Sequence, residues 1–163
     1  MSLVNELRLK KPVKLLAHEA LLSTYFTASC LRKKAGHFLQ PFGLTDVQFN
    51  LMMLLQHQAG PKGGLAQSQL SDMMLVNRAN ITSLIDRMEK ADLVARTSSP
   101  SDRRSNIIVL TSYGRNLLSQ IEPLYAKEVK RIMDVLLEDN QKQLIKMLEK
   151  IRSNISEKTE AAK

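Results

Sequence analysis

The sequence predicts a mainly α-helical protein with one small β-hairpin, and three observations support this fold class. Apolar residues recur at helical spacing over most of the chain, on both sides of its middle. Two short runs that favour β-strands, 94–98 and 106–110, are joined by a polar loop that contains Pro100. Apolar residues make up 44% and charged residues 25% of the 163 positions, which is typical of a globular protein with a real core.

The first helix is predicted over residues 13–31, after a polar start. Gly36, Pro41 and Gly43 are expected to break the chain behind it. Its helical pattern consists of Leu15, Leu16, Leu22, Tyr25, Phe26 and Leu31.

The second helix is predicted to begin at Asp46. Thr45 and Gln48 have the spacing of a capping box, and Leu44 and Phe49 stand where a hydrophobic staple is found. The glycine and proline cluster over 60–64 should end this helix. Its predicted buried face consists of Val47, Leu51, Leu54 and Leu55.

Two further helices follow, and the second has two chemically different faces. A short helix is predicted over Gln67–Met74, and another over Asn77–Ala91 with Asn77 as its N-cap. The inward stripe of the latter is predicted to be Ile81, Leu84, Ile85 and Met88. Its outward face is predicted to carry Arg78, Ala79, Thr82, Ser83 and Asp86.

The hairpin comes next and two long helices complete the chain. Thr111 is placed to cap the first of them, and Pro123 should bend it because proline lacks an amide hydrogen and clashes with the preceding turn. The last helix is predicted after Asp139 and Asn140. A helix, a tight turn, a second helix and a hairpin are the parts of a winged helix-turn-helix, here with additional terminal helices.

Composition excludes several classes of protein. The only cysteine, Cys30, permits neither a disulfide nor a cysteine-based zinc site within one chain, and the three histidines lack short ligand spacing. No metal, no cofactor and no enzyme chemistry is expected, since the sequence has no phosphate-binding glycine loop and no paired nucleophile and base. No apolar run is long enough to cross a membrane, which predicts a cytoplasmic protein without a membrane partner.

The net charge of +8 favours a polyanionic partner, because a basic surface displaces counterions from phosphates. Charge does not locate the site, however. Residues 1–44 carry seven Lys or Arg and two acidic residues, whereas residues 60–110 carry seven and five. A solvated helical surface would explain the same excess.

Polar residues at two places suit contact with DNA. Small residues at the start of the fourth helix let its backbone approach base edges, and its polar side chains offer hydrogen bonds to bases or phosphates. A capped surface helix that meets only solvent is the alternative. At the hairpin tip, Asp102 could hold the guanidinium of Arg104 in a fixed direction for a narrow minor groove. The hydrogen-bonding side chains of the helix are those of Arg78, Asn80, Thr82 and Ser83.

Over nearly its whole length the sequence resembles the multiple-antibiotic-resistance regulator (MarR) family of winged helix-turn-helix regulators. The matching stretches are Gly43-Leu44-Thr45 with Gln48-Phe49, Leu70-Ser71-Asp72, 81–90, Leu93-Val94-Ala95-Arg96, Asp102-Arg103-Arg104 and Leu110-Thr111-Ser112-Tyr113-Gly114.

The resemblance implies a homodimer that binds double-stranded DNA at a pseudo-palindromic operator. Residues 13–40 and 112–156 of a single domain, 1–163, would form the dimer, and residues 45–110 would read DNA. Many members bind small aromatic or lipophilic acids between the dimerisation helices and the DNA-reading lobe. The predicted DNA-binding residues are Asn77, Arg78, Ala79, Asn80, Thr82, Ser83, Arg87, Arg96, Asp102, Arg103 and Arg104.

The sequence departs from the family pattern at two turns. Leu75 stands where glycine is frequent, and Ala91-Asp92 replaces a pair that ends in glycine. Asp92 is expected to adopt the left-handed conformation, which aspartate tolerates better than most residues. One branch of the family senses hydroperoxides through a cysteine of the first helix, but Cys30 falls late in that helix and is expected to be a small buried side chain.

The predicted function is that of a sequence-specific DNA-binding repressor, dimeric and released by a small-molecule effector. The alternative is a winged-helix protein-interaction module without specific DNA binding. Such a module would be expected to lose Arg78, Arg96 and the Asp102 and Arg104 pair, and all four residues are present.

Overall fold

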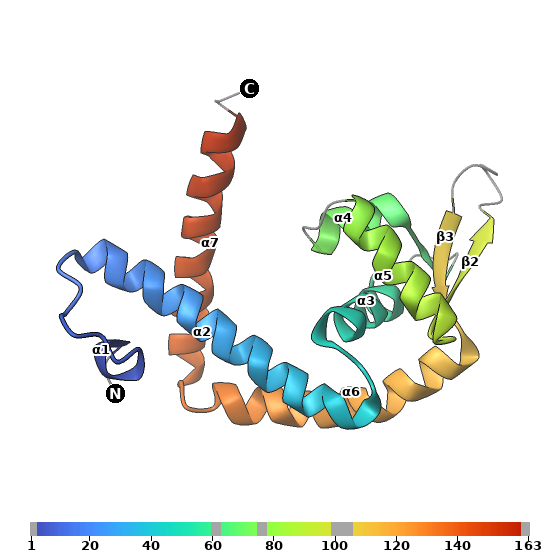
Figure 1. Ribbon diagram of the computed structural model, residues 1–163, viewed down its shortest axis with the longest axis horizontal. Helices are drawn as coiled ribbons and strands as arrows, with labels where there is room; N and C mark the ends of the chain where they lie inside the picture. The colour runs from blue at the N-terminus through green and yellow to red at the C-terminus, as the bar shows by residue number, and fades with distance from the viewer. Residues whose placement is uncertain (1–2, 60–62, 75–77, 99–105, 161–163) are drawn as a thin grey trace. The chain divides into compact units, whose positions relative to one another are not determined.

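The computed structural model describes residues 3–59, 63–74, 78–98 and 106–160, and it confirms a mainly α fold with a small antiparallel sheet (Figure 1). The chain divides into two compact units, Met1–Ser119 and Gln120–Lys163. The elements are α1 (Leu3–Glu6), α2 (Leu16–Leu39), the 3-10 turn η1 (Gln40–Phe42), α3 (Asp46–His57), β1 (Leu65–Ala66), α4 (Gln67–Met74), α5 (Arg78–Lys90), β2 (Val94–Ser98), β3 (Asn106–Leu110), α6 (Ser112–Met133) and α7 (Glu138–Glu160).

The core of the first unit lies between helices α3, α4 and α5 and the sheet. Helix α4 packs against α5, α5 against β2, and α3 against β3. The fully buried side chains in these elements are Leu51, Met52, Leu70, Ile81, Ile85, Met88, Val94 and Ile108. Burial of this many large aliphatic side chains supplies the main driving force for folding of the unit.

The sheet has three strands in the order β1-β3-β2, one more than predicted. The hairpin strands have the predicted bounds, with Val94 opposite Leu110 and Ser98 opposite Asn106. Strand β1 pairs Leu65 with Ile108 across the other edge of β3. Gly64 precedes it, and a Cβ atom there would lie 2.5 Å from the carbonyl oxygen of Ile108, so glycine permits this close approach.

Helix α3 confirms the predicted capping box. The Gln48 amide donates to the Thr45 hydroxyl over 3.2 Å, and the Thr45 amide donates to Gln48 Oε1 over 2.9 Å. The predicted buried face was partly wrong, because Val47 is 42% exposed and Leu54 is only half-buried. Phe49 and Met52 are buried instead, so the apolar stripe of α3 is rotated relative to the one predicted.

Helix α2 is longer than predicted and runs through Gly36 to Leu39. An isolated glycine costs a helix about 1 kcal/mol relative to alanine, which is too little to end it. The chain turns only at η1, which contains Pro41, and at Gly43, whose φ of 70° is left-handed. The expected burial of Cys30 was wrong, since this free thiol is exposed. Helix α1 was not predicted either.

Helix α6 begins in the first unit and ends in the second. The Gly114 amide donates to the Thr111 hydroxyl over 2.9 Å, which confirms Thr111 as its cap. The helix contains Pro123 and continues to Met133; the bend at Pro123 stays a prediction. Gln141 of α7 stabilises the connection between α6 and α7, because its side-chain amide donates to the carbonyl oxygens of Met133 and Leu136.

Candidate nucleic-acid interface

Helix α5 has the two faces that its sequence predicts. Ile81, Leu84, Ile85 and Met88 are at most 4% exposed and fix the helix on the core. Ala79, Asn80 and Ser83 lie on the exposed face, in the first two turns of the helix. The described side chains of this surface are therefore short, and they lie on a helix whose opposite face is buried in the core.

Thr82 differs from the predicted outward position. It is half-buried, and Gln67 Nε2 donates to its hydroxyl oxygen over 2.6 Å. Gln67 is the first residue of α4, so this bond joins the start of α4 to the exposed half of α5. Sequence reasoning missed Gln67, because nothing in its local pattern indicates a partner that lies 15 positions away.

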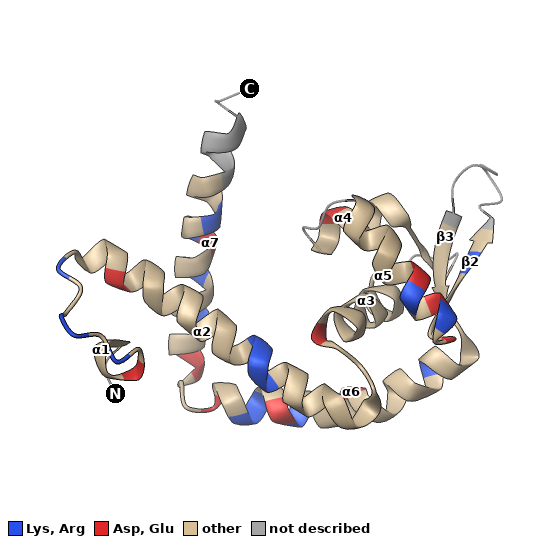
Figure 2. Cartoon of the chain, viewed as in Figure 1, with Lys and Arg blue, Asp and Glu red and all other residues tan. Residues whose placement is uncertain are grey.

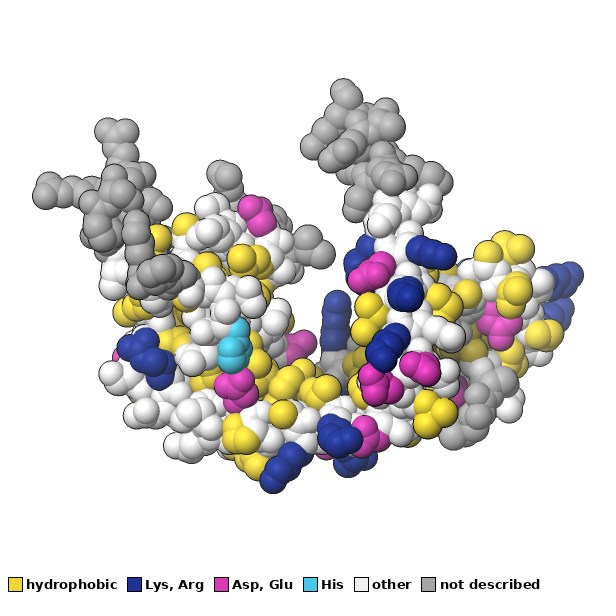
Figure 3. All heavy atoms as spheres, turned by 180° about the vertical axis from the view of Figure 1, so that it is seen from behind, with side chains coloured by type: hydrophobic (Ala, Val, Ile, Leu, Met, Phe, Trp, Pro, Cys, Tyr) yellow, Lys and Arg dark blue, Asp and Glu magenta, His cyan; other side chains and the backbone are white. Residues whose placement is uncertain are grey.

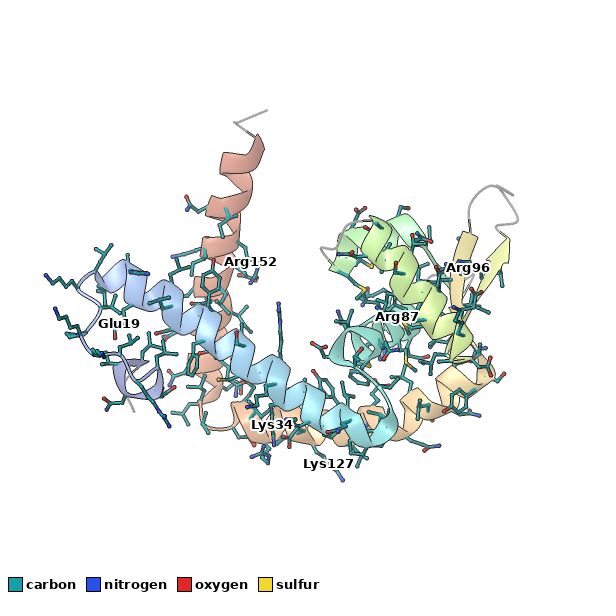
Figure 4. The ribbon with its side chains drawn as sticks, in the orientation of Figure 1. Glu19, Lys34, Arg87, Arg96, Lys127 and Arg152 are labelled. Atoms are coloured by element: carbon teal, nitrogen blue, oxygen red, sulfur yellow. The ribbon has the colours of Figure 1, made fainter. Side chains whose placement is uncertain are left out.

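Arg87 and Arg78 lie at the two ends of the same helix. The Arg87 side chain is exposed, and its Nε donates to the carbonyl oxygen of Ser83 over 3.2 Å (Figure 4). Arg78 is the first residue of α5. Its side chain and all of Asn77, the predicted cap, lie outside the described residues.

Arg96 lies on β2 beside α5 (Figure 4). Its guanidinium donates hydrogen bonds to two carboxylates. One terminal nitrogen donates to Asp86 over 2.5 Å, and the other donates to Glu89. Acidic and basic residues accordingly meet where α5 ends beside β2 (Figure 2). Burial lowers the pKa of Arg96, but the hydrogen bonds and negative charges of both carboxylates outweigh it and raise the pKa above its ordinary value. The charge of Arg96 is therefore stabilised by protein carboxylates.

The turn between α5 and β2 has the left-handed residue that the sequence predicts. Asp92 has a φ of 55°, and the Leu93 amide donates to the carbonyl oxygen of Met88 over 2.9 Å. The Thr111 hydroxyl donates to the Asp92 carbonyl oxygen over 2.5 Å, and the Thr111 amide donates to that of Leu93. These hydrogen bonds connect the turn to the start of α6 and so fix the position at which β2 begins.

The predicted wing tip, Asp102, Arg103 and Arg104, and the departure at Leu75 lie outside the described residues. The structure does describe the two strands that carry the tip. The pair formed by Ser98 and Asn106 is the last in the ladder, at the end of the strand pair farthest from the turn at Asp92.

Large hydrophobic side chains are exposed on the helices outside the core (Figure 3). In α2 these are Leu16, Leu21, Tyr25 and Leu31, and in α7 they are Ile145, Met147, Ile151 and Ile155. The described residues contain no group of three or more histidine, cysteine or acidic side chains that could hold a metal ion. In the same part of the chain, no helix has the length and hydropathy needed to span a membrane.

Comparison with known proteins gives consistent matches. Residues 42–105 match the model of the MarR family. The HTH-type transcriptional regulator MhqR of Bacillus subtilis (strain 168) is 32% identical over 112 residues, which cover 69% of this chain and 74% of MhqR.

Two solved structures of similar proteins contain DNA. One is Sco3205, a MarR family transcriptional regulator from Streptomyces coelicolor in complex with DNA, with a TM-score of 0.76, 25% identity, and coverage of 89% of this chain and 92% of that one. The other is the transcriptional repressor CouR bound to a 23-mer DNA duplex, with a TM-score of 0.70, 32% identity, and coverage of 87% and 99%.

Proposed function

This chain belongs to the MarR family of DNA-binding transcriptional regulators, and we propose that it is a dimeric repressor. We propose further that a small-molecule effector releases it from its operator. As a regulator of this family it is not an enzyme. The observation that carries the DNA-binding part of the proposal is the exposed face of α5, where the short polar side chains of Asn80 and Ser83 lie on a helix whose opposite face is buried.

The exposed face of α5 suits a major groove. Ala79 lets the helix backbone approach base edges, and the side chains of Asn80 and Ser83 offer donors and acceptors at its first two turns. We assign the phosphate and base contacts of this helix to Asn77, Arg78, Ala79, Asn80, Thr82, Ser83 and Arg87. We assign the minor-groove contact to the hairpin tip, with Asp102 orienting Arg104 and with Arg103 beside them.

The exposed hydrophobic side chains support a homodimer. Leu16 is 79% exposed and Ile155 is 61% exposed, and large apolar side chains recur along both α2 and α7. A monomer with these apolar side chains exposed to solvent would be prone to aggregate, whereas a second copy of the chain would cover them. We propose that residues 13–40 and 112–156 form the dimer and that residues 45–110 read DNA.

Repression and release by an effector rest on relatives and on family resemblance. CouR is described as a transcriptional repressor and is 32% identical to this chain. The effector class that the family resemblance implies is a small aromatic or lipophilic acid. Addition of such acids to a complex of the protein with its operator tests the release directly.

The experiment that tests DNA reading begins with the genomic fragments that the purified protein retains. Footprinting on an enriched fragment should show two half-sites about 10 base pairs apart from centre to centre, because a two-fold dimer places its paired helices in successive major grooves. Protection of one asymmetric half-site would contradict a symmetric dimer. Retention of all fragments alike, or of none, would favour the protein-interaction module instead.

Two substitutions separate base reading from phosphate contact. Asn80→Ala should change the preferred sequence, at a discrimination of about 1–3 kcal/mol for a good base contact. Arg104→Ala should weaken binding to all DNA and should lower the dependence of log Kd on log salt by about one per subunit. Asn50→Ala is the matched control, since Asn50 is an exposed asparagine on α3 and should have neither effect.

A further inference from the structure

Arg96 occupies a defined place between the two elements that are proposed to contact DNA. It lies on β2, which leads into the hairpin tip, and it pairs with Ile108 of β3. Side chains alternate between the faces of a strand, so Arg96 shares its face with Val94. Val94 is 1% exposed and points into the core beneath α5. The aliphatic stem of Arg96 therefore extends along α5 at the edge of that core.

The partners of Arg96 come from a single face of α5. Asp86 and Glu89 are three residues apart, which places their side chains one above the other on a helix. Glu89 accepts hydrogen bonds from the Arg96 guanidinium and, over 3.1 Å, from the Arg96 backbone amide. Glu89 thus accepts hydrogen bonds from both the main chain and the side chain of Arg96. Asp86 accepts one from the second terminal nitrogen of the Arg96 guanidinium.

The charge of this cluster is unfavourable for a phosphate. One guanidinium and two carboxylates give a net charge of −1. The Arg96 side chain is 23% exposed, whereas those of Asp86 and Glu89 are 49% and 38% exposed. A phosphate that approached Arg96 would therefore meet two carboxylates that are more exposed than the guanidinium itself.

We propose that Arg96 is a positioning residue for the wing: together with Asp86 and Glu89 it fixes β2 against α5 and does not itself bind phosphate. This inference rests on the proposed function, since it concerns how the reading helix and the hairpin tip reach DNA together. If the angle between α5 and the hairpin is set before binding, neither element has to be ordered on the DNA. The entropy cost of binding is then lower, so affinity is gained without a further contact. The inference replaces the predicted DNA contact of Arg96 by an indirect role.

The first test measures operator binding by Arg96→Met over a range of salt concentrations. Methionine keeps much of the aliphatic stem but removes the charge and the hydrogen bonds. We expect binding to be about tenfold weaker, because the wing must then be ordered during binding. The salt dependence should be unchanged, because no phosphate contact is lost. A fall in the salt dependence by about one per subunit would show that Arg96 binds phosphate and would overturn the proposal.

The second test separates positioning of the wing from general stability. In an Arg104→Ala background, Arg96→Met should weaken DNA binding by less than about twofold, because the wing contact that it positions is already absent. Its effect on the melting temperature should be the same in both backgrounds. Fully additive losses of affinity would mean that Arg96 does not act through the wing, and they would overturn the proposal.

Two conservative variants keep the test decisive if Arg96→Met does not fold. Glu89→Gln removes a negative charge yet retains an oxygen for the Arg96 amide, and weaker operator binding is expected. Stronger binding, as simple electrostatic attraction to DNA would give, would contradict the proposal. Arg96→Lys should lie between wild type and Arg96→Met, because lysine lacks the planar fork that reaches two carboxylates.

A matched control is available in the second unit. Arg131 of α6 pairs with Glu128 at 2.8 Å, so Arg131→Met makes the same chemical change at an arginine that is also held by a carboxylate. Arg131 lies in the segment proposed to form the dimer, so this control is measured at a protein concentration at which the variant is dimeric. The salt dependence of operator binding by that dimer should equal that of the wild type. Wild-type protein without preference for any operator would refute the proposed function itself, a result distinct from every outcome above.

Discussion

Replacing Gly114 by alanine should destabilise the protein, although alanine favours helices more than glycine does. Gly114 is buried in the first turn of α6. A Cβ atom there would lie 2.1 Å from the carbonyl oxygen of Leu93 and 3.0 Å from its carbonyl carbon. Both neighbours are backbone atoms of the turn between α5 and β2, so no side chain can rotate away.

The size of the effect follows from what must move. Carbon and oxygen that are not bonded stay about 3.3 Å apart, so the start of α6 would have to shift by about 1 Å. The shift strains the hydrogen bonds that Thr111 makes to the Asp92 and Leu93 carbonyl oxygens. Overpacking of this kind costs about 1–3 kcal/mol and a weakened hydrogen bond about 1 kcal/mol, against a gain of about 1 kcal/mol in helix propensity. The free energy of unfolding should fall by about 1–3 kcal/mol.

Urea unfolding at a fixed protein concentration measures this effect, with Gly36→Ala as the matched control. A Cβ atom at Gly36, within α2, would meet no atom within 4 Å. The same substitution should there raise the free energy of unfolding by up to about 1 kcal/mol, because alanine restricts the unfolded chain. Gly114→Ala that is as stable as the wild type, or two variants that shift in the same direction, would refute the reasoning.

Three further predictions concern single elements. Thr45→Ala should lower the free energy of unfolding by about 1 kcal/mol because it removes the capping box of α3, and urea unfolding beside the exposed control Thr27→Ala would show whether the cap contributes. Cys30→Ser should change stability by less than about 0.5 kcal/mol because the thiol is exposed. It should also leave operator binding and its response to peroxide unchanged, because Cys30 falls late in α2 and outside the residues assigned to DNA; loss of a peroxide-induced release would assign it a redox role. Deletion of residues 1–35 should cause aggregation visible by light scattering, whereas a folded, well-behaved monomer would contradict the proposed dimer.

Features that depend on neighbouring residues along the chain were predictable. The start of α3 follows from Thr45 and Gln48, which satisfy each other three positions apart. The bounds of β2 and β3 follow from two short runs that favour β-strands on either side of one loop. The wrong predictions arose where a weak local signal competed with packing. Gly36 costs its helix too little to end it, and Val47 is exposed because α3 turns Phe49 and Met52 inward.

Features that depend on residues far apart in the sequence were not predictable. Strand β1 is two residues long, too short for any alternation, and exists because β3 offers it an edge. The bond from Gln67 to Thr82 needs α4 and α5 to cross at one angle. The requirement for glycine at position 114 is likewise invisible in α6 itself, since it comes from the Leu93 carbonyl oxygen.

Arg96 shows why the type of a residue does not determine its partner. An arginine beside a predicted DNA-binding hairpin has the charge that a phosphate needs, and the sequence gives no reason to prefer another ligand. On α5, however, Asp86 and Glu89 stand one helical turn apart, at the spacing that lets a single planar guanidinium reach both. A partly buried arginine with two carboxylates of its own gains little from a phosphate, because the phosphate would have to displace or repel them. The position of such an arginine contributes to DNA binding through the strand it holds, and only the fold brings its partners together.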